Sequence, residues 1–230
     1  MKVAIISDIH GNFDALSSFS ETYDELWVLG DLVNYGPQPG EVIDYVREKA
    51  AIVLRGNHDQ ALAYGQDPHC VPPFRELAAE TQKITDTLLN DEQRAYLRSL
   101  PTSLRFMRDR ASFFLCHATP SNPLYGYLEC HSPVWIEASA AVGVDYLLAG
   151  HTHIQFIRQL GGRIVANPGS LGQSASGGAE GRYAVWENGI LSLKSLAYPV
   201  ERTVEKVRSL PLSCSIQAKL IRLFEEGAIS

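Results

Sequence analysis

Three apolar runs near the start of the chain alternate with segments of helical pattern, and this alternation restricts the fold more than any other feature. A continuous apolar run such as KVAIIS at 2–7 is typical of a strand that is covered on both faces. The pattern returns in ELWVLGD at 25–31 and in AIVLRGNHD at 51–59, with helical segments at 12–20 and 40–49 between them. This order predicts parallel strands joined by right-handed crossovers, and therefore an α/β fold.

The rest of the chain predicts further helices and several hairpins. Residues 60–100 are rich in Ala, Leu, Glu and Gln and are expected to be helical, with breaks at three prolines. Asn188-Gly189 between alternating apolar residues is a strong hairpin signal. The other expected elements are a hairpin over 103–117, a helix at 132–141, a strand within 144–153, a hairpin about Gly161-Gly162 and a C-terminal helix over 213–230. We find no internal repeat or long linker, so residues 1–230 are predicted to form a single domain.

Composition and charge exclude several classes of protein. The chain has 20 Lys and Arg against 26 Asp and Glu, a net charge of −6, and no basic run, so stable binding of nucleic acid is not expected. No apolar run approaches the ~18 residues that cross a membrane. The four cysteines form no CxxC pair, and the N-terminus lacks the pattern of a secretory signal. A cytoplasmic protein with reduced thiols is therefore expected.

Polar side chains follow the predicted strands, at the edge of the sheet where open α/β proteins bind their ligands. Five of the seven histidines lie at these strand ends. The polar residues in these positions are Asp8, His10, Asp31, Asn57, His58, Asp59, His117, His151 and His153. Because side chains alternate along a strand, Asp8 and His10 are expected to project together. The same holds for His151 and His153, so each pair can offer two ligand atoms to one centre.

The residue types in this cluster indicate a metal site. Imidazole with carboxylate suits manganese, iron, zinc or nickel better than calcium or magnesium alone. Asn57 would add a neutral amide oxygen. Asp31 could bridge two ions, because a carboxylate has two oxygens.

Taken in order, these motifs resemble those of the calcineurin-like metallophosphoesterase family. They are D-x-H (Asp8, His10), G-D (Asp31), G-N-H-D (Asn57 to Asp59), a single histidine (His117) and G-H-x-H (His151, His153). The resemblance spans about residues 1–197. NPGSLGQ at 167–173 is also similar to a motif of the family's small phosphodiesterase branch.

The resemblance implies a four-layer α/β/β/α sandwich of two mixed sheets with two divalent ions, for which manganese is expected and iron, zinc, nickel or magnesium are alternatives. One ion would be held by Asp8, His10, Asp31 and His153, and the other by Asp31, Asn57, His117 and His151. His58 would be the catalytic acid, and Asp59 would orient it.

The implied activity is hydrolysis of small phosphodiesters or phosphomonoesters, with nucleotides as a candidate class. A hydroxide that bridges the metals would attack phosphorus, and His58 would protonate the leaving oxygen. Two alternatives stay open. One is a binding scaffold of the same fold without catalysis, although the family's known scaffold lacks the histidine that His58 represents. The other is a dinucleoside polyphosphate hydrolase, which would share the site and differ in the pocket.

The sequence departs from the family in two places. Asn34 and Tyr35 stand in GDLVNYG where the family's protein phosphatases have an acid and an arginine, so protein phosphatase activity is not expected. Ala118 follows His117 where the family usually has glycine. Residues 60–100 are expected to set specificity. Tyr125 and Tyr127, in a loop near His117, would either line the substrate pocket or pack on the surface.

Overall fold

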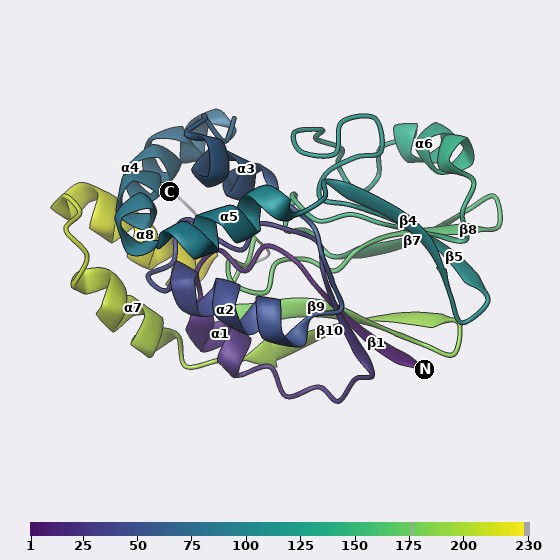
Figure 1. Cartoon of the computed structure of the whole chain (residues 1–230), viewed down its shortest axis with the longest axis horizontal. Helices are drawn as coiled ribbons and strands as arrows, with labels where there is room; N and C mark the ends of the chain where they lie inside the picture. Colours follow the sequence, from purple (N-terminus) through teal and green to yellow (C-terminus); the bar gives the residue numbers. More distant parts are fainter. Residues whose placement is uncertain (176, 228–230) are drawn as a thin grey trace.

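The computed structural model describes residues 1–175 and 177–227 and contains two facing five-stranded sheets with helices outside them (Figure 1). The first sheet has the order β10-β9-β1-β2-β3 and the second has the order β4-β5-β6-β8-β7. The strands of the first sheet are β1 (Lys2–Ile6), β2 (Glu25–Val28), β3 (Ile52–Val53), β9 (Glu180–Glu187) and β10 (Ile190–Ala197). Those of the second are β4 (Ser103–Arg108), β5 (Ala111–Cys116), β6 (Tyr146–Leu148), β7 (Phe156–Leu160) and β8 (Arg163–Asn167).

Both sheets are mixed, as predicted. β1 pairs in parallel with β2 and antiparallel with β9, so that Lys2 lies opposite Glu187. β5, β6 and β8 are parallel neighbours, whereas β4 and β7 pair antiparallel at the two edges. The three predicted hairpins are all present.

The apolar first strand is explained by burial on both of its faces. Val3 and Ile5 point toward the second sheet, where they join a core that contains Trp27, Phe113 and Trp186. The rings of Trp27 and Phe113 meet edge to face with centroids 5.0 Å apart, which is a favoured aromatic geometry. The alternate residues of β1 face the helices that cover the outer side of the first sheet.

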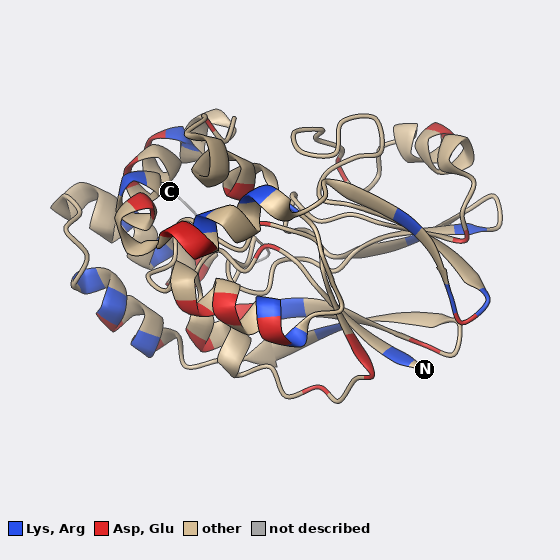
Figure 2. Ribbon diagram, in the orientation of Figure 1, with Lys and Arg blue, Asp and Glu red and all other residues tan. Residues whose placement is uncertain are grey.

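Helices cover the outer faces of both sheets and one end of the sandwich (Figure 1). α1 (Phe13–Ser17), α2 (Pro39–Lys49) and α5 (Asp91–Ser99) contribute to the core outside the first sheet, and α6 (Val134–Val142) packs on the second. α4 (Pro72–Leu88), α7 (Val200–Arg208) and α8 (Cys214–Glu226) share a further apolar cluster, and α3 (Asn57–Tyr64) contacts α4 and α5. The predicted four-layer arrangement is therefore confirmed. Both α2 and α4 carry basic and acidic residues (Figure 2).

Two sequence predictions need correction, and one helix was not predicted. The third strand contains only Ile52–Val53, because the residues from Asn57 onward form the first turn of α3. The C-terminal helix ends at Glu226, and residues 228–230 of the predicted range lie outside the described residues. α7 was not predicted, although Val200, Val204 and Val207 have helical spacing. Among the described helices, none is both long and apolar enough to cross a membrane.

Glu21 joins distant parts of the first sheet, and we expect its replacement by Gln to destabilise the protein. Its carboxylate accepts hydrogen bonds from Lys2 Nζ at 2.7 Å, Lys194 Nζ at 2.8 Å and Tyr183 Oη at 3.0 Å. Hydrogen bonds from Lys194 and Lys2 lower the pKa of Glu21 to about 2 from its usual 4.5. A carboxyl group whose pKa is lower in the folded state than in the unfolded state stabilises the fold. This stabilisation is complete above the unfolded-state pKa and is lost as the pH falls toward the folded-state pKa. Glu21→Gln should therefore lower the free energy of unfolding at pH 7 by about 1–2 kcal/mol.

Urea denaturation at a series of pH values would measure this effect. The difference between parent and Glu21→Gln should shrink as the pH falls from about 4.5 to about 2. Glu92, whose side chain is 84% exposed, offers a matched control, since Glu92→Gln should change little at any pH. If Glu21→Gln lowered the free energy of unfolding equally at pH 7 and at about pH 2, the charge of the carboxylate would not contribute to stability.

Candidate metal centre

The polar residues predicted from the strand ends converge in one buried cluster at the end of the sandwich. Three overlapping groups have ligand atoms within 4.8 Å of one another. They are Asp8 with His10 and His153, His10 with Asp31 and His58, and Asp31 with His117 and His151. Asn57 completes the cluster, with its Oδ1 3.0 Å from His117 Nε2. Asp31 belongs to two of the groups and therefore lies between the two predicted ion positions.

The backbone that presents these residues is not extended, which corrects the reason given for their placement. β1 ends at Ile6 and β6 at Leu148, before the ligands. Asp8, His10 and Asp31 have φ values of 54°, 50° and 54°, and His151 and His153 have 67° and 60°. Non-glycine residues rarely adopt this left-handed conformation, and a group of them is typical of functional sites. The side chains converge because of these loop conformations and not because of strand alternation.

Two glycines of the motifs are needed for close approach. A Cβ atom on Gly56 would lie 2.1 Å from Asp31 Oδ1, and one on Gly150 would lie 2.1 Å from Ser7 Oγ and 2.8 Å from Asp8 Oδ2. Either side chain would displace a carboxylate of the cluster. The first residue of G-N-H-D and of G-H-x-H is therefore fixed by packing against the acids.

Backbone carbonyl groups set the orientation of three imidazoles. A carbonyl only accepts, so the ring nitrogen that faces it carries the hydrogen, and the other nitrogen directs its lone pair into the cluster. His10 Nδ1 lies 3.1 Å from Val33 O. His117 Nδ1 lies 2.9 Å from Leu29 O, and His153 Nδ1 lies 2.9 Å from Gln173 O.

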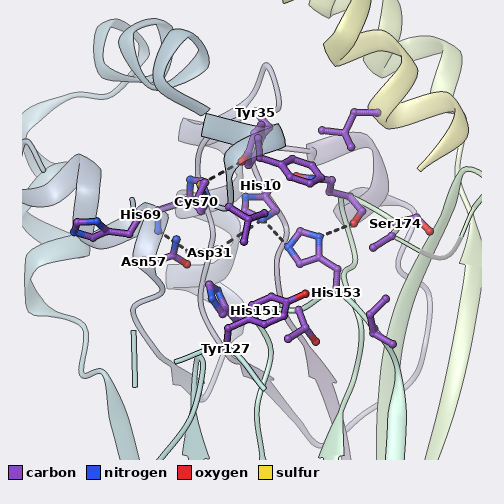
Figure 3. A pocket seen from close by; sticks show the side chains of 18 of the residues that line it. His10, Asp31, Tyr35, Asn57, His69, Cys70, Tyr127, His151, His153 and Ser174 are labelled. Carbon is purple, nitrogen blue, oxygen red and sulfur yellow. Dashed lines mark hydrogen bonds and ion pairs between the residues drawn. The ribbon is translucent and has the colours of Figure 1, made fainter. Parts of the chain in front are cut away.

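When all of these rings are neutral, as metal binding requires, acceptors face one another in the cluster. His10 Nε2 and His153 Nε2 are 3.1 Å apart and point toward each other (Figure 3). Asn57 donates its Nδ2 hydrogen to Pro68 O at 2.7 Å, so its oxygen faces His117 Nε2. Asp8 Oδ1 is buried without a hydrogen-bond partner among the described residues. Facing acceptors repel unless a cation or proton lies between them, and imidazole, carboxylate and amide donors suit a divalent transition metal.

The protonation states favour the same interpretation. Burial opposes ionisation of Asp8, but His153 outweighs it and lowers the pKa of Asp8 to about 2. Burial lowers the pKa of both His10 and His151 to about 4. Burial also disfavours the charged form of His117, but the nearby Asp31 carboxylate raises its pKa to about 9. At neutral pH Asp8 is therefore a carboxylate and His10 and His151 are neutral, whereas His117 holds a proton that a bound metal would displace.

His58 is oriented by Asn34 and not by Asp59, which corrects the predicted role of that acid. The Asp59 carboxylate accepts hydrogen bonds from the backbone N–H groups of Leu32 at 2.8 Å and Gly56 at 2.9 Å. It therefore closes the start of α3. Asn34 Nδ2 lies 2.9 Å from His58 Nδ1, and the Asn34 oxygen is already bound to the backbone N–H of Tyr35. The amide donates to Nδ1, so the hydrogen of a neutral His58 ring lies on Nε2.

The side chains of the NPGS segment hold the loops of the cluster in place. From the sequence alone, this segment could be a turn, a lining of the site, or both. Asn167 donates to the backbone oxygen of Gly150 at 2.7 Å, and Ser170 donates to that of Asp8 at 2.7 Å. Both side chains are buried. They hold the loops that carry Asp8 and His151, so the segment positions the ligands without being one of them.

Comparison with known proteins agrees with this geometry. Residues 1–188 match the calcineurin-like phosphoesterase superfamily domain. The chain belongs to this superfamily. A crystal structure of a metallophosphoesterase from Sphaerobacter thermophilus is 27% identical, covers 96% of this chain and 98% of that one, and superposes with a TM-score of 0.80.

Two curated proteins are similar to this chain over most of its length. An uncharacterized protein of Methanocaldococcus jannaschii is 25% identical over 228 residues, which is 89% of this chain and 91% of that protein. A symmetrical bis(5′-nucleosyl)-tetraphosphatase of Psychromonas ingrahamii is 30% identical over 194 residues. That match covers 77% of this chain but 61% of the tetraphosphatase, so the chain spans about three fifths of that relative.

Proposed function

We propose that the chain is a metal-dependent phosphoesterase that hydrolyses small phosphodiesters or phosphomonoesters at this cluster. The observation that carries the proposal is the convergence of three overlapping groups of carboxylate and imidazole side chains, whose ligand atoms lie within 4.8 Å of one another. In this proposal one manganese ion is held by Asp8, His10, Asp31 and His153. A second is held by Asp31, Asn57, His117 and His151.

Metal ions bound there would polarise the phosphoryl oxygens and activate the attacking water. The chain's own contribution is a rigid set of ligands. Asp31 Oδ2 lies 3.7 Å from His10 Nε2 and 3.3 Å from His117 Nε2, so one carboxylate oxygen serves both halves of the centre. Backbone carbonyls hold the rings in place, which fixes where the phosphoryl group can bind.

His58 provides the hydrogen bond that the leaving oxygen needs. Its Nε2 faces the cavity beside the cluster, 3.4 Å from Cys70 Sγ. Burial lowers the pKa of His58 to about 3, and the Asn34 amide presents a hydrogen to Nδ1, so the neutral ring with hydrogen on Nε2 is favoured. In this form His58 stabilises the charge that develops on the leaving oxygen by donating from Nε2.

Removal and return of metal test the proposal. Protein stripped with a chelator should not hydrolyse bis-4-nitrophenyl phosphate, and added Mn²⁺ should restore turnover until about two ions per chain are bound. Release of 4-nitrophenolate and the metal content of the dialysed protein are the measurements. Protein shown to hold two ions that hydrolyses neither this diester nor 4-nitrophenyl phosphate would contradict the proposal and favour the scaffold.

A further inference from the structure

A cavity of about 250 Å³ opens beside the metal cluster. Its floor contains His10, Asp31 and His153, and one side is formed by the segment around Cys70 and by α4. Tyr127 lies across from these residues, next to His151 (Figure 3). Whatever binds at the metals must therefore place the rest of its structure against these walls.

Among the described residues that line this cavity there is no lysine or arginine. The Arg55 guanidinium is already bound to the backbone oxygen of Arg98 at 2.9 Å and to Tyr64 Oη at 3.3 Å. Arg75 lines a separate cavity on the other side of Cys70. A chain of several phosphates would place charges beyond the metals, and buried charges without partners are costly. The cavity is therefore suited to a substrate with one phosphoryl group.

The walls beyond the metals are aromatic and aliphatic. Tyr35 is buried, and its ring centroid lies 5.0 Å from those of His10 and of His58. Tyr125 meets the His69 ring edge to face at 4.9 Å. Tyr127 is 56% exposed, a large ring left uncovered at the side of the cavity. Such rings are platforms for a flat aromatic group of the ligand.

Gln173 supplies a polar group that lacks a partner. It lines the cavity, is 4% exposed, and its Oε1 has no hydrogen-bond partner among the described residues. Its backbone is fixed, because its N–H donates to Ser170 Oγ at 2.8 Å and its carbonyl accepts from His153. A carboxamide carries both a donor and an acceptor, and it can pair with the edge of a nucleobase.

We propose that the substrate is a nucleoside ester with a single phosphoryl group, and that Gln173 recognises its base while the tyrosines stack on it. This inference rests on the proposed function, and it excludes dinucleoside polyphosphates as the substrate. In the reaction, water oxygen bonds to phosphorus and the ester P–O bond breaks. One proton of the water ends on the released alcohol and the other on the phosphate group or in solvent.

Four substrates of the Mn²⁺-loaded protein test the inference. The 4-nitrophenyl ester of thymidine 5′-monophosphate and methyl 4-nitrophenyl phosphate share charge and leaving group, and they differ in the nucleoside. We expect kcat/KM for the nucleoside ester to be about tenfold higher, the effect of one stacked base. Diadenosine tetraphosphate should be hydrolysed no faster than methyl 4-nitrophenyl phosphate. Bis-4-nitrophenyl phosphate tests whether the protein hydrolyses phosphodiesters at all.

The variant Gln173→Ala should reduce the preference for the nucleoside ester over the methyl ester about fivefold, the value of one hydrogen bond to a neutral group. Gln66→Ala, which removes an exposed carboxamide away from the metals, should leave the preference unchanged. Melting temperature and metal content establish that each variant is folded and loaded. If Gln173→Ala does not fold, the comparison of substrates on the parent protein decides alone.

The outcomes separate this inference from the proposed function. Turnover of the methyl ester and of bis-4-nitrophenyl phosphate without preference for the nucleoside ester would overturn the inference and leave the phosphoesterase. Diadenosine tetraphosphate as the best substrate would also overturn it. No turnover of any ester by loaded protein would overturn both.

Discussion

Replacing Asp31 by Asn should reduce hydrolysis of bis-4-nitrophenyl phosphate by about 10³-fold, because Asp31 would serve both halves of the proposed metal centre. Its Oδ1 accepts from the backbone N–H of His58 at 2.9 Å, and an Asn oxygen can keep that bond. The amide nitrogen would then replace Oδ2 and present hydrogens where His10 and His117 direct their lone pairs. The variant should therefore keep its fold and lose metal from both positions.

Metal content and hydrolysis rate, measured on the same sample, check this prediction. Asp109→Asn is a matched control, since Asp109 is 46% exposed and lies beside the N-terminus. It should behave like the parent protein. An Asp31→Asn protein that retains two ions per chain and a rate within about tenfold of the parent would show that the carboxylate is not shared between ions.

Replacing His58 by Ala should lower kcat by about 10²–10⁴-fold without loss of metal. His58 approaches His10 and Asp31, but it belongs to neither predicted ligand set, and its Nε2 lies 3.4 Å from Cys70 Sγ. Because its hydrogen bond acts on the leaving oxygen, the loss should be larger for esters of phenol than for esters of 4-nitrophenol, whose anion needs less stabilisation.

The dependence on the leaving group separates this role from a structural one. His131→Ala changes an exposed histidine and should affect neither ester. A His58→Ala protein with normal metal content that loses equal activity toward both esters would place His58 in positioning the phosphoryl group. Loss of metal in the same variant would instead make His58 a ligand, consistent with its approach to His10 and Asp31.

Much of the fold could be predicted because local sequence patterns indicate it. The doubly buried strand β1 and the hairpin signal at Asn188-Gly189 each depend on neighbouring residues, and the structure contains both. β3 was predicted too long, because Leu54 is apolar and buried although the strand ends at Val53. The pattern of apolar residues shows burial, and burial continues beyond the end of the strand.

The candidate site was predicted in its membership but not in its geometry. The sequence showed which side chains follow the strands, and the topology of parallel strands places them at one edge. It could not show that Asp8 and His10 have left-handed backbones, since a positive φ outside glycine is set by the surrounding packing. Nor could it show that Asn34 reaches His58 while Asp59 turns back to the backbone of Leu32. The neighbours in the chain differ from the neighbours in space.

The position of β1 between β2 and β9 has a consequence for biosynthesis. Residues 2–5 are synthesised well before residues 184–187, their partners on one edge. At about 5–20 residues per second, that edge stays open for roughly 10–40 seconds, and open strand edges are sites of aggregation. His153 and the NPGS segment are also synthesised well after Asp8 and Asp31. The nascent chain thus carries an unpaired β1 and an incomplete set of candidate ligands until these later segments have been made, so closure of the first sheet and completion of the candidate site both depend on them.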